Sequence, residues 1–409
     1  MSHETALITT VAAGFGMALL FGLAATRLRL PALVGYLLAG VALGPFTPGF
    51  VADAQLAPQL AEIGVILLMF GVGIHFSLRD LLAVRRIAVP GAVAQIAAAT
   101  LLGAGLGRFW GWSWGAGLVF GLSLSVASTV VLLRALEERN ASGSPEGRIA
   151  IGWLIVEDLA MVLALVLLPA AAPHGASSTP GGLVGLLGVT LAKVGAFVAL
   201  MAFVGRRAVP WLLERVAATG SRELFTLAVL AVALGIAVGA AFLFGVSFAL
   251  GAFLAGMVIN ESELSHEAAT NALPLRDAFA VLFFVSVGML VDPTILLSAP
   301  LQVLAVVGIV VVGKSLAALA IVLAFGHPPR TALTIAASLG QIGEFSFILA
   351  ALGVSLGLLP AEARSLILAG ALLSITLNPL LFGAIDSVDR WVLRRQARRA
   401  TSAAPGRTR

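Results

Sequence analysis

The sequence has little charge and no cysteine. Charged residues make up 11% of its 409 positions, hydrophobic residues make up 60%, and the mean hydropathy is +1.06. Soluble globular domains do not have this balance, so the composition predicts a polytopic membrane protein. The absence of cysteine excludes a disulfide framework and a thiolate metal site. The net charge of +5 does not indicate a nucleic-acid partner, because most basic residues are spread over short connecting segments.

Two further absences narrow the function classes. The sequence has no Thr-Val-Gly-Tyr-Gly run, which is the filter of potassium channels. It has five histidines, mostly between apolar runs, and no serine- or metal-hydrolase motif, which argues against a membrane enzyme. A gated potassium channel remains an alternative, and currents that persist without a proton gradient would identify it. A receptor or sensor that has lost transport is another alternative.

Long apolar runs dominate what is present. A helix needs roughly 20 apolar residues to cross ~30 Å of hydrocarbon. Runs of about this length are separated by proline, glycine or arginine, and residues 1–5 lack the basic start of a cleaved signal peptide. The pattern predicts an all-α protein with about 13 transmembrane helices. The predicted limits are 5–26, 30–49, 56–76, 87–108, 113–136, 149–170, 181–204, 222–241, 243–260, 271–291, 301–325, 330–352 and 361–385.

The basic residues predict the orientation of the chain in the membrane. If the N-terminus lies outside, every arginine except Arg108 and Arg364 falls on the inner side or in the basic tail at 386–409. Because cytoplasmic loops are enriched in arginine, we expect an outside N-terminus and a cytoplasmic C-terminus. The tail arginines would contact the anionic inner leaflet. The only lysines, Lys193 and Lys314, fall inside predicted spans.

The two halves of the chain repeat one another. Gly35-x-x-Leu-Ala-Gly40 returns 216 residues later as Gly251-x-x-Leu-Ala-Gly256. Leu67, Gly73 and Ser123-Leu124 return 215 residues later as Leu282, Gly288 and Ser338-Leu339. Six spans plus one linker span place the second copy upside down, which is the plan of many secondary transporters. We therefore predict a first inverted repeat at 1–180, a linker helix at 181–209 and a second repeat at 210–385.

Adjacent carboxylates lie in the middle of the 149–170 span. Glu157 and Asp158 would point about 100° apart on a helix, so both cannot face the same point. Charges at this depth are costly and usually mark an ion or proton path. Lys314 is also in mid-span and could pair with one of the acids, and such a pair can keep both charges in the interior. A static ion pair that only joins two helices is the alternative, but it leaves one acid without a partner.

Two spans carry polar interruptions. Ser125, Ser128 and Thr129 lie inside the fifth span, and Gln341 and Glu344 lie at the repeat-related place in the twelfth. Small and polar residues at this depth are typical of helices that unwind beside a cavity, where hydroxyls, carbonyls and half-helix dipoles can hold a cation. Close helix packing through small residues is the alternative explanation, and it suffices for Ser123 alone.

Several motifs together resemble one transporter family. These are Leu30-Pro-Ala-Leu-Val-Gly-Tyr-Leu-Leu-Ala-Gly40, Gly64-Val-Ile-Leu-Leu-Met-Phe-Gly-Val-Gly73, Ser128-Thr-Val-Val-Leu-Leu-Arg-Ala-Leu136, Val156-Glu-Asp-Leu159 and Gly343-Glu-Phe345. They resemble the monovalent cation:proton antiporter-2 family, in particular its Kef-type branch, over nearly all of residues 5–385. The resemblance implies a homodimer in the bacterial inner membrane, with a dimerisation domain and a core domain in which two broken helices cross.

The resemblance also implies roles for single residues. Asp158 matches the aspartate that binds the cation and the proton, and the variable residue before it is Glu157, which would pair with the matched lysine Lys314. The broken helices match Ser125–Thr129 and 340–344, so Ser125, Ser128 and Thr129 would contact the cation, with Gln341 and Glu344 nearby. Kef-type proteins usually carry a cytosolic nucleotide-binding domain after the last span, whereas this sequence stops at Arg409.

These observations predict antiport with K⁺ and H⁺ as substrates and no cofactor. Asp158 would bind a proton or a dehydrated cation, never both, and the core would expose it to each side in turn. Potassium is favoured by resemblance only, and sodium is the alternative. Exchange would be electroneutral if Glu157 and Lys314 stay charged and electrogenic if Lys314 loses its proton during the cycle. Lys193 has no assigned partner or role.

Overall fold

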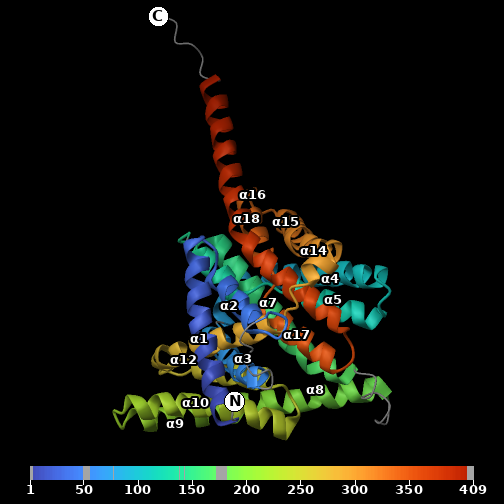
Figure 1. Cartoon of the computed structure of the whole chain (residues 1–409). Coiled ribbons are helices and arrows are strands. Elements are labelled where there is room, and N and C mark those ends of the chain that lie inside the picture. The colour runs from blue at the N-terminus through green and yellow to red at the C-terminus, as the bar shows by residue number, and fades with distance from the viewer. Residues whose placement is uncertain are drawn as a thin grey trace, which may run out of the picture.

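The computed structural model describes residues 3–48, 56–76, 78–137, 139–141, 143–171 and 182–402. These residues form helices and short connections without a strand, which confirms the predicted all-α fold (Figure 1). The first half contains α1 (His3–Arg27), α2 (Ala32–Leu43), α3 (Leu56–His75), α4 (Leu78–Phe109), α5 (Trp114–Ser125), α6 (Thr129–Glu137), α7 (Pro145–Leu167) and the 3₁₀ turn η1 (Leu168–Ala171).

The second half follows a long central helix. That helix consists of α8 (Gly182–Leu200), the π-helical turn η2 (Met201–Gly205) and α9 (Arg206–Ala217). The remaining elements are α10 (Arg222–Gly239), η3 (Ala240–Phe244), α11 (Phe248–Asn260), α12 (Ser265–Met289), α13 (Ile295–Ser298), α14 (Pro300–Val307), η4 (Gly308–Lys314), α15 (Ser315–Ala324), α16 (Pro329–Leu339), α17 (Glu344–Ser355) and α18 (Ala361–Ser402). Here η3 and η4 are also π-helical.

The helices differ in their ability to cross a membrane. Nine in the described ranges are long and apolar enough, and the bent pair α16–α17 gives a tenth. The predicted spans 30–49, 56–76 and 243–260 correspond to shorter apolar helices. The 12 residues of α2 between Pro31 and Gly44 cover only about 18 Å. The protein is therefore a multi-pass membrane protein, and the count of 13 spans stays a prediction that depends on these short helices.

The two predicted boundaries that differ most from the structure are those at the ends of the linker span and of the last span. The linker span expected at 181–204 continues as one helical rod through η2 to Ala217. The last span, expected to end at 385, continues as α18 to Ser402 and projects away from the other helices in Figure 1. Hydropathy marks where apolar residues stop, but a helix continues wherever the backbone can keep its hydrogen bonds, so composition underestimates both lengths.

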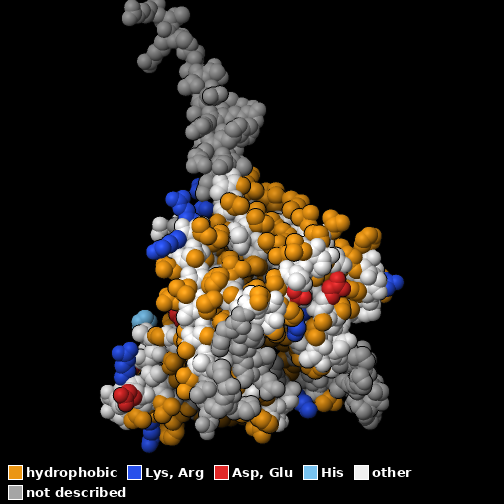
Figure 2. Space-filling model, in the orientation of Figure 1, with side chains coloured by type: hydrophobic (Ala, Val, Ile, Leu, Met, Phe, Trp, Pro, Cys, Tyr) orange, Lys and Arg blue, Asp and Glu red, His pale blue; other side chains and the backbone are white. Residues whose placement is uncertain are grey.

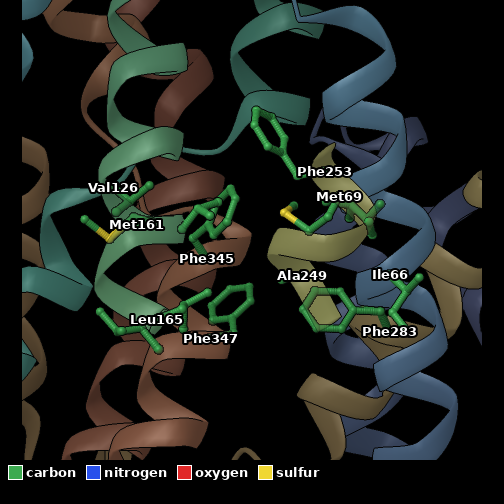
Figure 3. Packing of buried hydrophobic residues seen from close by; sticks show 14 of the residues in the cluster. Ile66, Met69, Val126, Met161, Leu165, Ala249, Phe253, Phe283, Phe345 and Phe347 are labelled. Atoms are coloured by element: carbon green, nitrogen blue, oxygen red, sulfur yellow. The ribbon is translucent and has the colours of Figure 1, made fainter. Parts of the chain in front are cut away.

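The helices pack as two units that combine parts of both halves. One unit, here called the scaffold, contains α1, α2, α3, α10, α11 and α12, with the linker helix beside α10 and α11. The other, here called the core, contains α4–α7 and α14–α18. Direct backbone contacts between the units are few, and apolar side chains fill the boundary. Figure 3 shows Phe345 and Phe347 of the core facing Met69 and Phe283 of the scaffold.

Glycine allows the scaffold helices to approach one another closely. A Cβ atom on Gly40 of α2 would lie 2.0 Å from the carbonyl oxygen of Val285 in α12. A Cβ atom on Gly288 of α12 would lie 2.1 Å from the carbonyl oxygen of Leu37. Only glycine permits such contact between backbones, so these two residues hold α2 against α12.

The seam between α3 and α11 has the same construction. A Cβ atom on Gly256 would lie 2.3 Å from the carbonyl oxygen of Phe70, and one on Gly73 would lie 2.1 Å from that of Phe253. Each of these four residues lies 215 or 216 positions from the residue with the same role in the α2–α12 seam. The repeat found in the sequence is therefore also present in the packing: α2 corresponds to α11 and α12 corresponds to α3, so the two seams use equivalent residues.

The surface of the bundle is apolar. On the face shown in Figure 2, hydrophobic side chains spread across the middle of the molecule and basic groups lie near its edges. Leu19, Leu20, Phe203, Leu227 and Phe242 are among the large side chains that remain exposed. Such a surface suits contact with lipid, because a water-soluble protein rarely exposes apolar patches of this extent.

Candidate functional site

Two core helices are broken at the middle of the bundle. Helix α5 (Trp114–Ser125) is preceded by Ser113, whose hydroxyl accepts from the backbone N–H of Ala116 and caps the helix. Residues 126–128 are not helical, and α6 begins at Thr129. The second break, residues 340–343, separates α16 from α17, and these half-helices are bent by 42°. Each break leaves backbone groups that need partners, because a helix end has unsatisfied N–H and C=O groups.

The two breaks bind one another. The backbone N–H of Gly343 donates to the carbonyl of Val126 at 3.0 Å. The side-chain amide of Gln341 accepts from the N–H of Ser128 at 3.2 Å and donates to its carbonyl at 3.1 Å. A Cβ atom on Gly343 would lie 2.3 Å from the carbonyl oxygen of Ala127, so glycine is required here. The repeat offset of 215 positions relates Val126 to Gln341 and Ser128 to Gly343. The two breaks therefore bind one another through repeat-related residues.

Both predicted acids on α7 reach the first break. Glu157 is fully buried, and its Oε2 accepts from the N–H of Ala127 at 2.9 Å. Asp158 is 4% exposed, and its Oδ2 accepts from the hydroxyl of Thr129 at 3.1 Å. Adjacent residues on one helix thus contact two different points of the break, as their angular separation predicts. Glu157 Oε1 and Asp158 Oδ1 are buried without a well-formed hydrogen bond, and Gln95 and Trp153 lie beside Glu157.

Lys314 reaches the other break. Its side chain is 1% exposed, and its ammonium donates to the carbonyl of Gln341 at 3.0 Å. Its charge also interacts with that of Glu157, so the pairing of these two groups stays a prediction, while the hydrogen bond of the ammonium is with the α16–α17 break. This arrangement is favourable because a cation stabilises the negative end of a helix dipole, here that of α16.

Glu344 adds a third buried carboxylate. It is the first residue of α17 and is 1% exposed, and its carboxylate lies beside Ser128 and Thr129 without a well-formed hydrogen bond to either oxygen. It lies close enough to Asp158 for the two charges to interact. Its repeat equivalent, 215 positions earlier, is Thr129, which binds Asp158. Three carboxylates and one ammonium therefore meet where the broken helices cross, and the site contains more negative than positive groups.

Several backbone carbonyls at the first break already have a hydrogen-bond donor. The carbonyls of Ser125, Val126 and Ser128 already accept from Gln95, Gly343 and Gln341, respectively. The hydroxyl of Ser125 donates to its own helix at the carbonyl of Leu122. The buried side-chain acceptors without a hydrogen-bond partner include carboxylate oxygens of Glu157, Asp158 and Glu344. Each carbonyl keeps a second lone pair, so contact between carbonyls and a cation stays a prediction. A sequence cannot reveal which donors reach the carbonyls, because those donors come from other helices.

Sequence reasoning missed four residues that support the breaks. Gln95 of α4 donates to Ser125, and Trp153 of α7 donates to Gln95. In α18, Ser374 accepts from the N–H of Ile342, and Asn378 donates to the carbonyl of Ala337. Gln95 and Asn378 could have been noticed as isolated amides in apolar runs, whereas an indole and a single hydroxyl give no such signal.

The second lysine lies away from this site. Lys193 is exposed on α8, and its ammonium is 3.8 Å from the position of a Cβ atom on Gly245, the left-handed residue that ends η3. That position explains why no partner among the acids could be assigned to it. Of the predicted site residues, the structure brings together Ser125, Ser128, Thr129, Glu157, Asp158, Lys314, Gln341 and Glu344.

Comparison with known proteins agrees with this geometry. The family described as "Sodium/hydrogen exchanger, transmembrane" matches residues 15–385. The chain belongs to this family. It is 66% identical over 388 residues to the provisionally named cation/proton antiporter YbaL of Escherichia coli (strain K12), covering 94% of this chain and 70% of YbaL. The expected resemblance to cation/proton antiporters is thereby confirmed.

Two more distant relatives extend the comparison. The chain is 35% identical over 362 residues to K(+) efflux antiporter 4 of Arabidopsis thaliana, covering 88% of this chain and 60% of the relative. The solved structure of the sodium proton antiporter MjNhaP1 from Methanocaldococcus jannaschii at pH 8 has a TM-score of 0.72 at 17% identity, covering 94% of this chain and 98% of that chain. At this identity the match establishes a common fold.

Proposed function

We propose that this chain is a secondary transporter that exchanges a monovalent cation for protons at Asp158. The observation that carries the proposal is the unpartnered Asp158 Oδ1 in a buried cluster with an excess of carboxylates. A buried charge without compensation is costly, so Asp158 is stable either as the neutral, protonated acid or as a carboxylate with a bound cation. Because one carboxylate cannot hold both, occupancy by one excludes the other and couples the two fluxes.

Two cavities between scaffold and core support alternating access. The first, of about 570 Å³, is lined by Pro45 and Phe46 after α2, by Phe283 of the scaffold, and by Leu165 and Phe347 of the core. The second, of about 450 Å³, is lined by Leu30 and Pro31 before α2, and by Val131 and Phe382 of the core. They therefore lie at opposite ends of α2. Apolar side chains such as Met69 and Phe345 lie where the scaffold faces the broken helices (Figure 3).

These positions suggest how access changes. The boundary between the two units is apolar, so one unit can slide along the other without breaking buried hydrogen bonds. In the proposed cycle the scaffold stays fixed, in a homodimer, while the core carries Asp158 toward one cavity and then the other. Thr129 and Ser128 would contact the dehydrated cation, and Glu344 and Gln341 would complete the site from α17 and its break.

The transported cation is proposed to be K⁺. The support is the 35% identity to a protein named as a K(+) efflux antiporter. Na⁺ is the second candidate, favoured by the family description. Both ions are substrates, and no cofactor enters the proposal. The exchange is proposed to take place in the bacterial inner membrane, which the similarity to a protein of Escherichia coli supports. The proposed orientation, with the N-terminus outside and the C-terminus in the cytoplasm, is supported by the arginine distribution.

The test is proton flux in proteoliposomes exposed to gradients of K⁺, Na⁺, Rb⁺ or Li⁺. The wild type should show cation-dependent proton flux, and Asp158→Asn should reduce it to the level of empty liposomes, because an amide cannot exchange a proton for a cation. Asp277→Asn provides the control, since this acid is exposed and pairs with Arg276. Cation-dependent proton flux by Asp158→Asn, or a current in the wild type without a proton gradient, would contradict the proposal.

A further inference from the structure

Helix α7 holds the first break at three successive points. Asp158 binds the hydroxyl of Thr129, and Glu157 binds the N–H of Ala127. The third contact is indirect. Trp153 lies one helical turn before Glu157 and on the same face. Its indole Nε1–H donates to Gln95 Oε1 at 2.8 Å, and Gln95 Nε2 donates to the carbonyl of Ser125 at 3.0 Å.

This third contact is buried and directional. The side chains of Gln95 and Trp153 are both fully buried. Because the indole can only donate, it fixes the amide oxygen of Gln95 toward itself and turns the amide NH₂ toward Ser125. The indole has room because α4 carries Gly91 opposite it, where a Cβ atom would lie 2.3 Å from the ring. The last carbonyl of α5 therefore has a donor whose orientation is set by a second side chain.

The second break has an equivalent donor with a different charge. Lys314 donates to the carbonyl of Gln341 and lies at the junction of η4 and α15. This segment packs against α4, the helix that carries Gln95. The repeat offset of 215 places the counterpart of Lys314 at Ala99, one helical turn after Gln95. Gln95 thus does for the α5–α6 break, with a neutral amide, what Lys314 does for the α16–α17 break with an ammonium.

We propose that Gln95, oriented by Trp153, is a positioning residue that sets the affinity of the site for its cation. The amide stabilises the end of α5 without adding positive charge to the side of the site that holds Glu157 and Asp158. A second ammonium, placed at the first break, would repel a bound cation. Without any donor, the Ser125 carbonyl would be unsatisfied and the break would be free to shift. This proposal rests on the proposed function, since affinity is measured by exchange.

Three variants separate the parts of this argument. Trp153→Phe keeps an aromatic ring but removes the N–H, so the amide of Gln95 is free to turn. Gln95→Met keeps the length of the side chain but removes the donor. Gln95→Lys keeps a donor and adds charge. Trp112→Phe and Gln302→Met are the matched controls, because they make the same changes in the core away from the break.

The readout is the KM for the cation together with kcat, from proton flux in proteoliposomes. Losing a buried hydrogen bond should raise the KM by about tenfold in Trp153→Phe and Gln95→Met, with kcat within about twofold because the groups that bind the ions are intact. Gln95→Lys should raise the KM further, although it restores a donor. A role as hydrogen-bond donor alone predicts the opposite for Gln95→Lys, namely a KM closer to wild type than that of Gln95→Met, and a role in packing alone predicts a wild-type KM for Gln95→Met.

Hydrogen exchange of the 120–130 backbone provides a readout that does not depend on transport. Trp153→Phe should speed exchange at Ala127 and its neighbours, and Trp112→Phe should not. If the wild type proves inactive but this local change is seen, the proposed function fails and the positioning of the break stands. A wild-type KM in both Trp153→Phe and Gln95→Met, with unchanged hydrogen exchange, would overturn the inference. If Gln95→Met does not fold, Trp153→Phe decides alone.

Discussion

The scaffold and the core are built on opposite principles, although each takes helices from both repeats. The scaffold seams are closed by backbone contact at glycines such as Gly40 and Gly256, with apolar side chains around them. The core crossing is held by hydrogen bonds among buried polar groups, and several carboxylate oxygens there lack a partner. Contacts between backbones fix one geometry, whereas a polar cluster with unsatisfied atoms can change its occupant. The difference suits a rigid support and a unit that binds an ion.

Replacing glycine at the close contacts of the scaffold and the core should have the largest effects on stability and on exchange. Gly40→Ala would force α2 from α12, because its Cβ would lie 2.0 Å from a carbonyl oxygen, and should lower the free energy of unfolding by about 3 kcal/mol or more. Gly343→Ala would separate the two breaks and should abolish exchange even where the protein still folds. Thermal unfolding in detergent and proton flux in liposomes measure the two effects.

Gly16→Ala is the control for both. A Cβ atom on Gly16 would meet nothing within 4 Å, so this variant should be neutral or more stable by up to about 1 kcal/mol. If Gly40→Ala unfolds at the same temperature as Gly16→Ala, the scaffold is not closed by backbone contact. If Gly343→Ala exchanges ions at the wild-type rate, contact between the breaks is not needed for transport.

Removing the ammonium of the core should have the next largest effect. Lys314→Met leaves the Gln341 carbonyl without its donor and the carboxylates without their nearby positive charge. Leaving buried charge uncompensated should cost about 3 kcal/mol of unfolding free energy, measured by thermal or denaturant unfolding. Lys314→Arg keeps the charge and should recover part of the loss, unlike Lys314→Met. Equal stability of all three proteins would show that the ammonium does not support the crossing.

The smallest expected effect is the dependence of the apparent KM for the cation on pH. If proton and cation compete for Asp158, protons occupy the carboxylate more often as the pH falls. Below the pKa of that carboxyl, each unit of pH should therefore raise the apparent KM for the cation by about tenfold while the maximal rate stays constant. Initial rates of proteoliposome exchange at several cation concentrations and pH values measure this. A maximal rate that falls with pH at constant KM would show that proton and cation do not share a site.

Much of the core site could be predicted from local residue patterns. Acids, a lysine and polar interruptions inside apolar runs stand out because hydrocarbon penalises them, so Glu157, Asp158, Lys314, Gln341 and Glu344 are visible in the sequence. Their contacts are not visible. Charge predicts that Lys314 pairs with Glu157, but it does not predict the hydrogen bond from the ammonium to the Gln341 carbonyl in the second break. Trp153 and Ser374 were missed because neither is unusual for an apolar helix.

The sequence by itself determined that the chain is an all-helical membrane protein with a repeated half and acids at membrane depth. Composition and periodicity suffice for this, because lipid requires apolar surfaces and internally satisfied backbones. Only the tertiary structure decided which helices form the scaffold and which form the core, how the breaks satisfy each other, and which oxygens remain for an ion. Those outcomes depend on contacts between residues that can be more than 200 positions apart, and local pattern carries no information about the direction in which such groups meet.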